Sequence, residues 1–542
     1  MPDANCARHL QRSADFVSLR ETTGANVELP LLTRVLEGGD AFHLTPSTTS
    51  EAHTHENPVM GSLCGAGSQN PLPHLPGPGE QYRFHFDMTK CIGCKCCVVA
   101  CNEQNGNPAD ILWRRVGEIE GGVYPKTHRH YISMGCNHCL EPTCLTGCPV
   151  DAYSKDSLTG IVRHSADACI GCQYCTWNCS YGVPQYNPER GVVGKCDMCY
   201  GRLARGQEPA CAAACPESAI RIELVNVGEW RNDYRASANS PGMPSADDSI
   251  STTRVSLPVK MPADVGKVDL RHLRAAEAHW PLIVMTILTQ LSVGAFASIW
   301  FLQVFGDQPH RAAALVALVV ALVALGASTL HLGRPLHAIR ALKMWRRSWL
   351  SREVLLFTLF ALAGATYSGT LWINSRSTTC LGALTAVLGI CGVGASARLY
   401  LVKGRPAWNT PLTFAEFGST TIVLGFCGAN VLVSARPQAA IVWSIAFALA
   451  IAGLKLVRLA KSRVHELHSS WQLLASVYSN HLLIRLVLML AGMGVAAFGS
   501  GGWPRIVVGL LIVAEEFMGR YLFFVSVVPT NMASEYLVQE AA

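Results

Sequence analysis

The sequence has few charged residues and only a small excess of one sign. Charged side chains account for 15% of its 542 residues, against roughly 25% in an average soluble protein. The formal net charge of +6 is small for this length, so a nucleic-acid partner is not indicated. Hydrophobic residues reach 50%, and the composition excludes collagen-like, coiled-coil and wholly disordered chains. We therefore expect a membrane protein that also carries a soluble domain.

The first 80 residues lack an export signal. No apolar segment follows the first Met and no Arg-Arg pair occurs near it, so neither a secretory nor a twin-arginine signal is expected. The region is rich in Ser, Thr, Pro, Gly and His, and residues 70–79 (NPLPHLPGPG) indicate a Pro/Gly linker. We predict that residues 1–80 form a loosely ordered N-terminal extension. The alternative is a strap that lies against a partner subunit.

Cysteine is abundant and unevenly distributed, because 17 of the 22 cysteines fall within residues 81–225. Sixteen of them form four motifs. The first and third have the spacing C-x2-C-x2-C-x3-C, the second widens its middle gap to four residues, and the fourth has two pairs separated by eleven residues. In order, the motifs contain Cys91, Cys94, Cys97 and Cys101; Cys136, Cys139, Cys144 and Cys148; Cys169, Cys172, Cys175 and Cys179; and Cys196, Cys199, Cys211 and Cys215.

These spacings predict iron–sulfur clusters. Three thiolates of a C-x2-C-x2-C turn can surround one iron–sulfur cube, while the fourth cysteine ligates the neighbouring cluster. Sixteen thiolates suffice for four [4Fe–4S] clusters. Structural zinc is the alternative, but it favours separated pairs that close one tetrahedron. Cys96 would break the spacing and is expected to be a bystander. No nucleophile–base pair or Gly-rich phosphate loop can be identified in residues 81–225, so we predict electron transfer and no catalytic residue.

Long apolar runs dominate the chain from Pro281 onward. Most approach the roughly 20 residues that cross a hydrocarbon core, and in lipid only helices or closed barrels satisfy their own backbone. We predict about eight transmembrane helices within residues 271–542, the sixth and seventh being the weakest, after an exposed linker at 226–270. The runs cover residues 281–305, 312–331, 354–373, 380–397, 412–434, 439–454, 482–499 and 505–528.

Lys and Arg are unevenly shared between the two ends of these runs. The loops on the side of the Cys-rich domain carry 13 of them, and the opposite loops carry four. Because positive residues accumulate in cytoplasmic loops, we expect an inner-membrane protein whose Cys-rich domain faces the cytoplasm. A disulfide framework is not expected in that reducing compartment.

The motif order, with the stretches CIGCQYC (169–175) and KCDMCYGRLARG (195–206), closely resembles the iron–sulfur subunit of dimethyl sulfoxide reductase-type and sulfite dehydrogenase-type molybdoenzymes. The resemblance implies an α+β ferredoxin-like tandem [4Fe–4S] domain at 81–225, followed by an all-α polytopic membrane bundle. Two normally separate subunits are thus joined over residues 81–535. The apolar half resembles the membrane anchor subunit through HWPL (279–282), HLGRP (331–335), SWLSRE (348–353), RPAWNTP (405–411) and EFMGR (516–520).

The resemblance also implies how the cysteines share the clusters. Each cluster takes thiolates from two motifs, and the fourth cluster would lie nearest the quinone site while the first would lie nearest the catalytic subunit. Ser180 stands where the family usually has Pro, which leaves the sulfur ligands unchanged. The implied ligands are Cys91, Cys94, Cys97 and Cys215 (thiol set 1); Cys101, Cys196, Cys199 and Cys211 (set 2); Cys136, Cys139, Cys144 and Cys179 (set 3); and Cys148, Cys169, Cys172 and Cys175 (set 4).

An ionisable group in a membrane helix is costly and is a candidate for function. His331 ends the second apolar run and Glu353 opens the third, both on the side of the Cys-rich domain. A His can hydrogen-bond a quinol oxygen and a Glu can accept its proton, and the resemblance associates both positions with menaquinol binding. Alternatively, His331 caps its helix and Glu353 pairs with Arg352 or Arg347.

We expect an electron-transfer and anchor subunit that links membrane menaquinone or ubiquinone to a separate molybdopterin catalytic subunit. Cytoplasmic placement favours a sulfite-dehydrogenase-like complex over a sulfoxide-reductase-like one. The alternatives are a redox-driven proton-translocating subunit and a membrane-bound redox sensor. In the last run, Glu516 and Arg520 are four residues apart and are expected to pair. His279 and His481 allow one b-type haem by count, but the family resembled is haem-free and none is expected.

Overall fold

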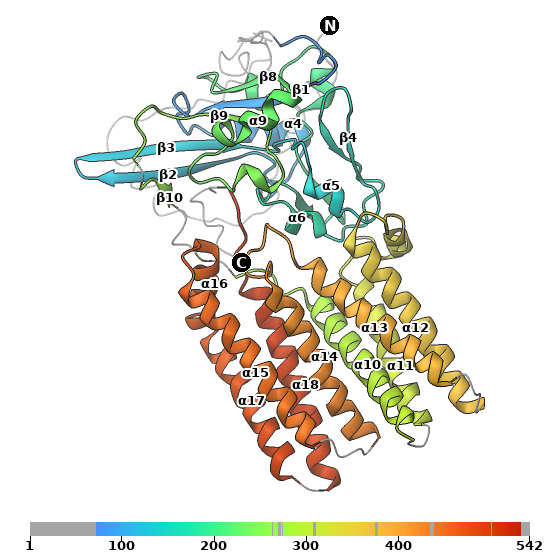
Figure 1. Ribbon diagram of the computed structural model, residues 1–542. Coiled ribbons are helices and arrows are strands. Elements are labelled where there is room, and N and C mark those ends of the chain that lie inside the picture. The colour runs from blue at the N-terminus through green and yellow to red at the C-terminus, as the bar shows by residue number, and fades with distance from the viewer. Residues whose placement is uncertain are drawn as a thin grey trace, which may run out of the picture. The chain divides into compact units, whose positions relative to one another are not determined.

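The computed structural model describes residues 72–532, apart from residue 263, residues 269–272, residue 274, residues 307–309, 374–377 and 434–437, and residue 500. The predicted N-terminal extension therefore lies outside the described residues except for its last nine positions. Figure 1 shows a Cys-rich part built from strands and short helices and a part built from long helices. The fold class predicted from the sequence, a ferredoxin-like domain followed by a helical membrane region, is confirmed.

The first sheet of the Cys-rich domain has β1 (Glu80–Asp87) at its centre. It pairs antiparallel with β8 (Ile220–Asn226) and parallel with β9 (Arg254–Ser256). The aromatic side chains Tyr82 and Phe84 of β1 are buried. Because these positions alternate along the strand, they place one face of the sheet on the core. The sheet thus joins the start of the domain to two segments that follow the last cysteine motif.

The segment 226–270, expected to be an exposed linker, is instead part of this domain. It contains α9 (Val227–Ser237), the 3-10 turn η1 (Ala246–Asp248), β9 and β10 (Gly266–Lys267). Thr252 and Thr253 of this segment are buried, and both hydroxyls donate to oxygens of Asn137, next to the second motif. The correction has a simple cause: a strand of three residues is stable only through its pairing with β1, which a local reading of the sequence does not reveal.

The remaining strands form three small sheets, and short helices follow the cysteine motifs. One sheet has the order β10-β2-β3, and the other two are two-stranded hairpins. The strands are β2 (Arg115–Val123), β3 (Lys126–Met134), β4 (Tyr153–Lys155), β5 (Val162–His164), β6 (Gln185–Asn187) and β7 (Val192–Gly194). The helices are α4 (Cys96–Asn105), α5 (Thr143–Gly147), α6 (Tyr174–Asn178), α7 (Tyr200–Leu203) and α8 (Ala210–Ala213).

Each of the eight predicted apolar runs is a helix. Two further elements, the 3-10 helix η3 (Pro335–Leu342) and the short helix α16 (His465–Ala475), connect them on the side of the Cys-rich domain. The long helices are α10 (Trp280–Val304), α11 (Arg311–Thr329), α12 (Trp349–Ile373), α13 (Thr378–Leu399), α14 (Pro411–Leu432), α15 (Gln438–Lys461), α17 (Ser479–Phe498) and α18 (Gly502–Val525).

Within the described residues, seven of these helices are long and apolar enough to span a membrane, and α18 is the exception. The expected weak helices, now α15 and α17, both qualify. Helix α18 is long enough but carries Glu515, Glu516 and Arg520, which are all buried. It packs against α17, α14 and α10. The bundle therefore hides the charges that lower the hydropathy of this helix.

Helices α10 and α14 cross in backbone contact. A Cβ atom added at Gly294 would lie 2.4 Å from the carbonyl oxygen of Thr421, and one at Gly425 would lie 2.9 Å from Gly294. Small residues at a crossing let membrane helices approach closely. This crossing makes α10 a central helix of the bundle, and its N-terminal end leads directly toward the Cys-rich domain.

Candidate metal centres and the membrane junction

The sixteen motif cysteines lie near one another in the combinations implied by the resemblance. Electrostatic interactions join Cys91 to Cys94 and Cys215, and Cys101 to Cys196, Cys199 and Cys211. They likewise join Cys144 to Cys136, Cys139 and Cys179, and Cys175 to Cys148, Cys169 and Cys172. The four thiol sets are therefore spatial neighbours in the folded chain and not only a pattern in the sequence.

Interactions between the sets give their order. Cys97 of set 1 is close to Cys211 of set 2, and Cys196 of set 2 is close to Cys136 of set 3. Tyr153 interacts with thiols of both set 3 and set 4. The sets thus follow one another in the order 1, 2, 3, 4, as a chain of electron carriers requires.

The surroundings of the thiols fit a positively charged metal group. Burial raises the pKa of Cys139, Cys172 and Cys196 to about 12. A thiolate there needs a compensating cation, and metal binding would release the proton. Around set 1 the structure has a cavity lined by all four of its cysteines, Lys95 and Pro216 among others. Among the described residues, no three His, Cys, Asp or Glu side chains lie close enough to share one metal ion.

Two buried cations sit between consecutive thiol sets. Arg114 donates to the carbonyl and the hydroxyl of Ser133, both at 3.2 Å, and that hydroxyl lies 3.2 Å from the sulfur of Cys97. Arg114 interacts with thiols of sets 1 and 2. Lys195 donates to the carbonyl oxygens of Cys196 (2.7 Å) and Val162, and interacts with thiols of sets 2 and 3. Positive charges thus accompany the row of thiols.

Neither cation was identified from the sequence. Lys195 is directly next to Cys196, so its place in the fourth motif was an available signal. Arg114 lies between motifs, and nothing nearby in the sequence distinguishes it. Burial opposes the charge of Arg114, but the neighbouring thiolates raise its pKa above its usual range. Its Nη2 atom is buried without a hydrogen-bond partner in the described part of the chain, as expected for a group that faces an acceptor such as a cluster sulfur.

The loop after α11 lies directly against the third cysteine motif. The backbone nitrogen of Arg334 donates to the carbonyl oxygen of Ile170 (3.1 Å), and that of Gly333 to Gly171 (3.4 Å). A Cβ atom at Gly333 would lie 2.2 Å from the carbonyl oxygen of Gly191. Only glycine allows the two backbones to approach this closely. The contact fixes Cys169 and Cys172 at the membrane side of the domain.

The start of α12 holds the end of the second motif in the same way. Ser348 donates to the carbonyl oxygen of Gly147 (2.6 Å), and Ser351 donates to that of Pro149 (3.3 Å). Arg347 forms an ion pair with Asp151 at 3.0 Å. These residues flank Cys148, so both segments that carry thiol set 4 are attached to the membrane part.

His331 lies at this contact. Its Nδ1 is 2.6 Å from the carbonyl oxygen of Ser328, so the ring caps its own helix as the alternative interpretation proposed. The ring also interacts with the backbone of Cys172, a member of thiol set 4. Burial lowers the pKa of His331, which favours the neutral imidazole with one donor and one acceptor nitrogen.

Glu353 is buried in the first turns of α12. Its carboxylate interacts with the hydroxyl of Ser396 on α13 and is electrostatically close to Tyr174 and Tyr400. The alternative pairing with arginine is wrong. Arg347 binds Asp151, as described above, and Arg352 donates to the carbonyl oxygens of Trp345 and Arg346.

His331 and Glu353 lie on opposite sides of the third motif and are not directly bonded. Among the described residues, no hydrogen bond or ion pair connects their side chains. Tyr174, which follows Cys172 by two positions, donates to the carbonyl oxygen of Leu399 at 2.9 Å and is close to both Glu353 and Cys172. Sequence reasoning missed Tyr174, although its place within the third motif was a signal.

An aromatic cluster closes the junction below the third motif. The ring of Trp177 lies 5.3 Å from His279 and 5.3 Å from Trp408, measured between centroids. Its centroid is 6.0 Å from that of Tyr400, which packs in turn on Phe524. This cluster excludes water between the Cys-rich domain and the helices and makes their contact largely apolar.

Comparisons with known proteins agree with this geometry. The model of the 4Fe-4S dicluster domain matches residues 127–224, and that of the DMSO reductase anchor subunit matches residues 274–525. An anaerobic dimethyl sulfoxide reductase chain of Haemophilus influenzae is 37% identical over 177 residues, covering 31% of the present sequence and 85% of that protein. The protein described here belongs to this family.

Other relatives place it among several complexes. A sulfite dehydrogenase subunit of Allochromatium vinosum is 34% identical over 160 residues, 26% of this chain and 67% of that protein. The formate dehydrogenase iron-sulfur subunit of H. influenzae is 36% identical over 169 residues, 27% of this chain and 54% of that protein. The chain is thus an iron–sulfur electron-transfer subunit fused to a DMSO reductase-type anchor, as predicted.

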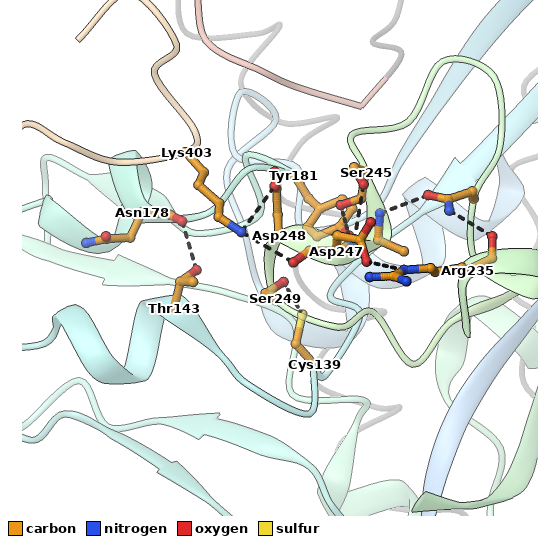
Figure 2. A network of polar contacts seen from close by, with 12 residues as sticks. Cys139, Thr143, Asn178, Tyr181, Arg235, Ser245, Asp247, Asp248, Ser249 and Lys403 are labelled. Atoms are coloured by element: carbon orange, nitrogen blue, oxygen red, sulfur yellow. Dashed lines mark hydrogen bonds and ion pairs between the residues drawn. The ribbon is translucent and has the colours of Figure 1, made fainter. Parts of the chain in front are cut away.

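The fusion is reinforced by the segment after α9 (Figure 2). Ser249 donates to the sulfur of Cys139 at 3.0 Å, and Tyr181 donates to the carbonyl oxygen of Ser245 at 3.2 Å. Lys403, in the loop between α13 and α14, reaches Asp248 at 3.7 Å. One short segment therefore contacts both a cysteine of thiol set 3 and a loop of the anchor.

The charged residues of α18 do not pair as expected. Glu516 accepts a hydrogen bond from Thr420 at 2.9 Å, and Arg520 donates to Gln290 at 3.0 Å. The predicted Glu516–Arg520 ion pair is wrong, because partners on neighbouring helices satisfy each group separately. Glu515 forms an ion pair with Arg485 of α17 at 2.8 Å.

Proposed function

We propose that this subunit carries electrons between a membrane quinone and a separate molybdopterin catalytic subunit through four [4Fe–4S] clusters. Thiol sets 1 to 4 would hold one cluster each. When bound, the clusters supply one-electron carriers with potentials set by their surroundings. Menaquinone or ubiquinone is the proposed diffusible partner.

The observation that carries this proposal is the contact between the loop after α11 and the third motif. Gly333 and Arg334 bond to the backbone beside Cys169 and Cys172, and His331 interacts with Cys172 itself. A quinone held by His331 would therefore lie beside thiol set 4. Set 1, at the other end of the row, has the exposed Cys94 and is the proposed exit toward the catalytic subunit.

The side chains at this junction can perform the proton chemistry of a quinol. A neutral His331 offers one nitrogen to a quinol oxygen while the other is held by Ser328. Glu353, buried and hydrogen-bonded to Ser396, is the proposed proton acceptor. The aromatic cluster around Trp177 excludes water, so protons leave through defined groups.

The orientation follows from the loop charges. The end of the bundle that carries the Cys-rich domain has most of the Lys and Arg residues, which supports a cytoplasmic placement in the inner membrane. The proposed catalytic partner then works in the cytoplasm, which favours a sulfite-dehydrogenase-like complex. Protease treatment of sealed inverted vesicles should digest the Cys-rich domain, and protection there would contradict the orientation.

The test is quinol-driven reduction of the clusters in the purified full-length chain. We expect His331→Ala and Glu353→Gln each to slow the bleaching of cluster absorbance by reduced decylubiquinone at least tenfold, without loss of iron. His337→Ala in the same loop is the control and should reduce like the wild type. Wild-type reduction rates in both junction variants would refute the proposed quinone site.

A further inference from the structure

A second cavity lies in the other half of the bundle, between α15, α16, α17 and α18. It measures about 480 Å³, within the range of small-molecule sites. Most of its wall is apolar and exposed to the lipid side. The wall contains Leu449, Leu456 and Leu459 of α15, Trp471 and Leu474 of α16, Leu482, Leu486 and Met489 of α17, and Leu522 and Phe523 of α18.

The inner end of this groove is polar. Glu416, Lys455 and Arg485 line it. Glu416, Arg485 and Gly519 also line a smaller adjoining cavity, together with Glu516 and Arg520. Gly519 is needed for this arrangement, because a Cβ atom there would lie 2.7 Å from the guanidinium of Arg485. The groove thus has the form of a site for an amphiphile, with an apolar channel that ends at hydrogen-bonding groups.

The polar end lies below the membrane surface. Glu416 follows the start of α14 by five positions, and Arg485 follows the start of α17 by six. At 1.5 Å per residue this is about 8 Å inside the helix ends. A phospholipid keeps its charged head group at the surface, whereas an uncharged polar head group can lie at this depth.

The charges at the polar end are balanced. Lys455 binds Glu416 at 2.7 Å, and Arg485 binds Glu515 at 2.8 Å. With Glu516 and Arg520 the group contains three carboxylates and three cations. A balanced group of donors and acceptors favours a neutral ligand with carbonyl or hydroxyl oxygens and does not favour an anionic lipid.

We propose that this groove is a second quinone site, which holds the ring of a polyprenyl quinone or quinol near Glu416 and Arg485 and its tail along the leucines of α15 and α17. The proposal rests on the quinone-linked function proposed above, but it concerns a different cavity. The groove and the junction have no lining residue in common among those named for each, so the two sites can be emptied separately.

The test uses decylubiquinone as the probe and the purified full-length chain in detergent. Retained quinone is extracted after gel filtration and counted per chain. Gly453 of α15 lines the groove, and a Cβ atom there meets nothing within 4 Å, so Gly453→Trp should fill the groove without a clash. We expect about two quinones per wild-type chain and about one for this variant.

Two further variants make the result decisive. Gly369→Trp, at an equally open glycine of α12, is the matched control and should retain both quinones. Ala475→Trp fills the groove from α16 and should repeat the loss, should Gly453→Trp fail to fold. If either groove variant with full iron content retains as much quinone as wild type, or releases phospholipid instead of quinone, the proposal is overturned.

A variant of the junction separates this proposal from the proposed function. The double variant His331→Ala, Glu353→Gln should retain about one quinone, and adding Gly453→Trp should remove it. Full loss in the double variant alone would contradict the second site and support the junction site. Unchanged binding in the double variant that Gly453→Trp still halves would support the second site and contradict the junction.

Discussion

At the scale of single residues, buried cations beside the thiols are the feature with the clearest consequence. Arg114 is 3% exposed and lies between thiol sets 1 and 2, and Lys195 is 3% exposed and lies between sets 2 and 3. A reduced cluster carries one more negative charge than an oxidised one. A buried positive charge nearby therefore stabilises the reduced form and raises the potential.

Removal of this charge should be measurable. We expect Arg114→Gln to lower the midpoint potentials of the two clusters beside it by roughly 50 to 100 mV, with the other two nearly unchanged. A redox titration followed by electron paramagnetic resonance reports each cluster. The control is Arg129→Gln, which removes an exposed arginine paired with Glu120. A shift of equal size in both variants would contradict a local effect.

One carboxylate links the first sheet to pH. Glu223 of β8 lies 2.5 Å from Nδ1 of His85 and 3.0 Å from Arg83. Burial opposes its ionisation, but these contacts lower its pKa to about 2, from an unfolded value near 4.5. The stabilisation is therefore complete above about pH 5 and is lost as the pH falls toward 2.

A comparison of melting temperatures tests this. Wild type should melt higher than Glu223→Gln at neutral pH, and the gap should narrow between pH 5 and pH 3 as the wild-type carboxylate is protonated in the unfolded state. Thermal unfolding of the full chain at several pH values measures it. A gap that stays constant over this window would show that Glu223 does not act through its charge.

At the scale of elements, the approach of the α11–α12 loop to the third motif controls the junction. The backbones of Gly333 and Gly191 leave no room for a methyl group. We expect Gly333→Ala to push this loop from the motif and to slow quinol-driven reduction tenfold or more, since a displacement of about 1 Å can cost a hundredfold. Stopped-flow absorbance of the clusters provides the measurement.

Gly326→Ala in α11 is the matched control, because a Cβ atom at Gly326 meets nothing within 4 Å. It should leave both iron content and reduction rate unchanged. If Gly333→Ala reduces as fast as this control, the close contact between loop and motif does not determine the rate.

The elements also show what local patterns can and cannot predict. The apolar runs predicted each long helix, and the cysteine spacing predicted the thiol sets, because both signals are local. The segment 226–270 was misread because β9 depends on pairing with β1, far away in the sequence. The Glu516–Arg520 pair was misread because Thr420 and Gln290, from other helices, compete for these groups.

At the scale of the whole molecule, the row of thiol sets and the anchor form one arrangement. Set 4 is attached to the loops after α11 and before α12, and set 3 is tied through Ser249 to the segment that contacts Lys403. Such contacts between parts that are separate subunits in related proteins explain why a fused chain preserves the same order of sites. The central claim is that this row carries four clusters.

Iron and acid-labile sulfide per chain, measured together with the integrated resonance signal of the dithionite-reduced protein, test that claim most directly. The account predicts about sixteen iron and sixteen sulfide per chain, and about four interacting paramagnetic clusters. Half that amount of iron or less, or zinc bound to the motif cysteines, would contradict it.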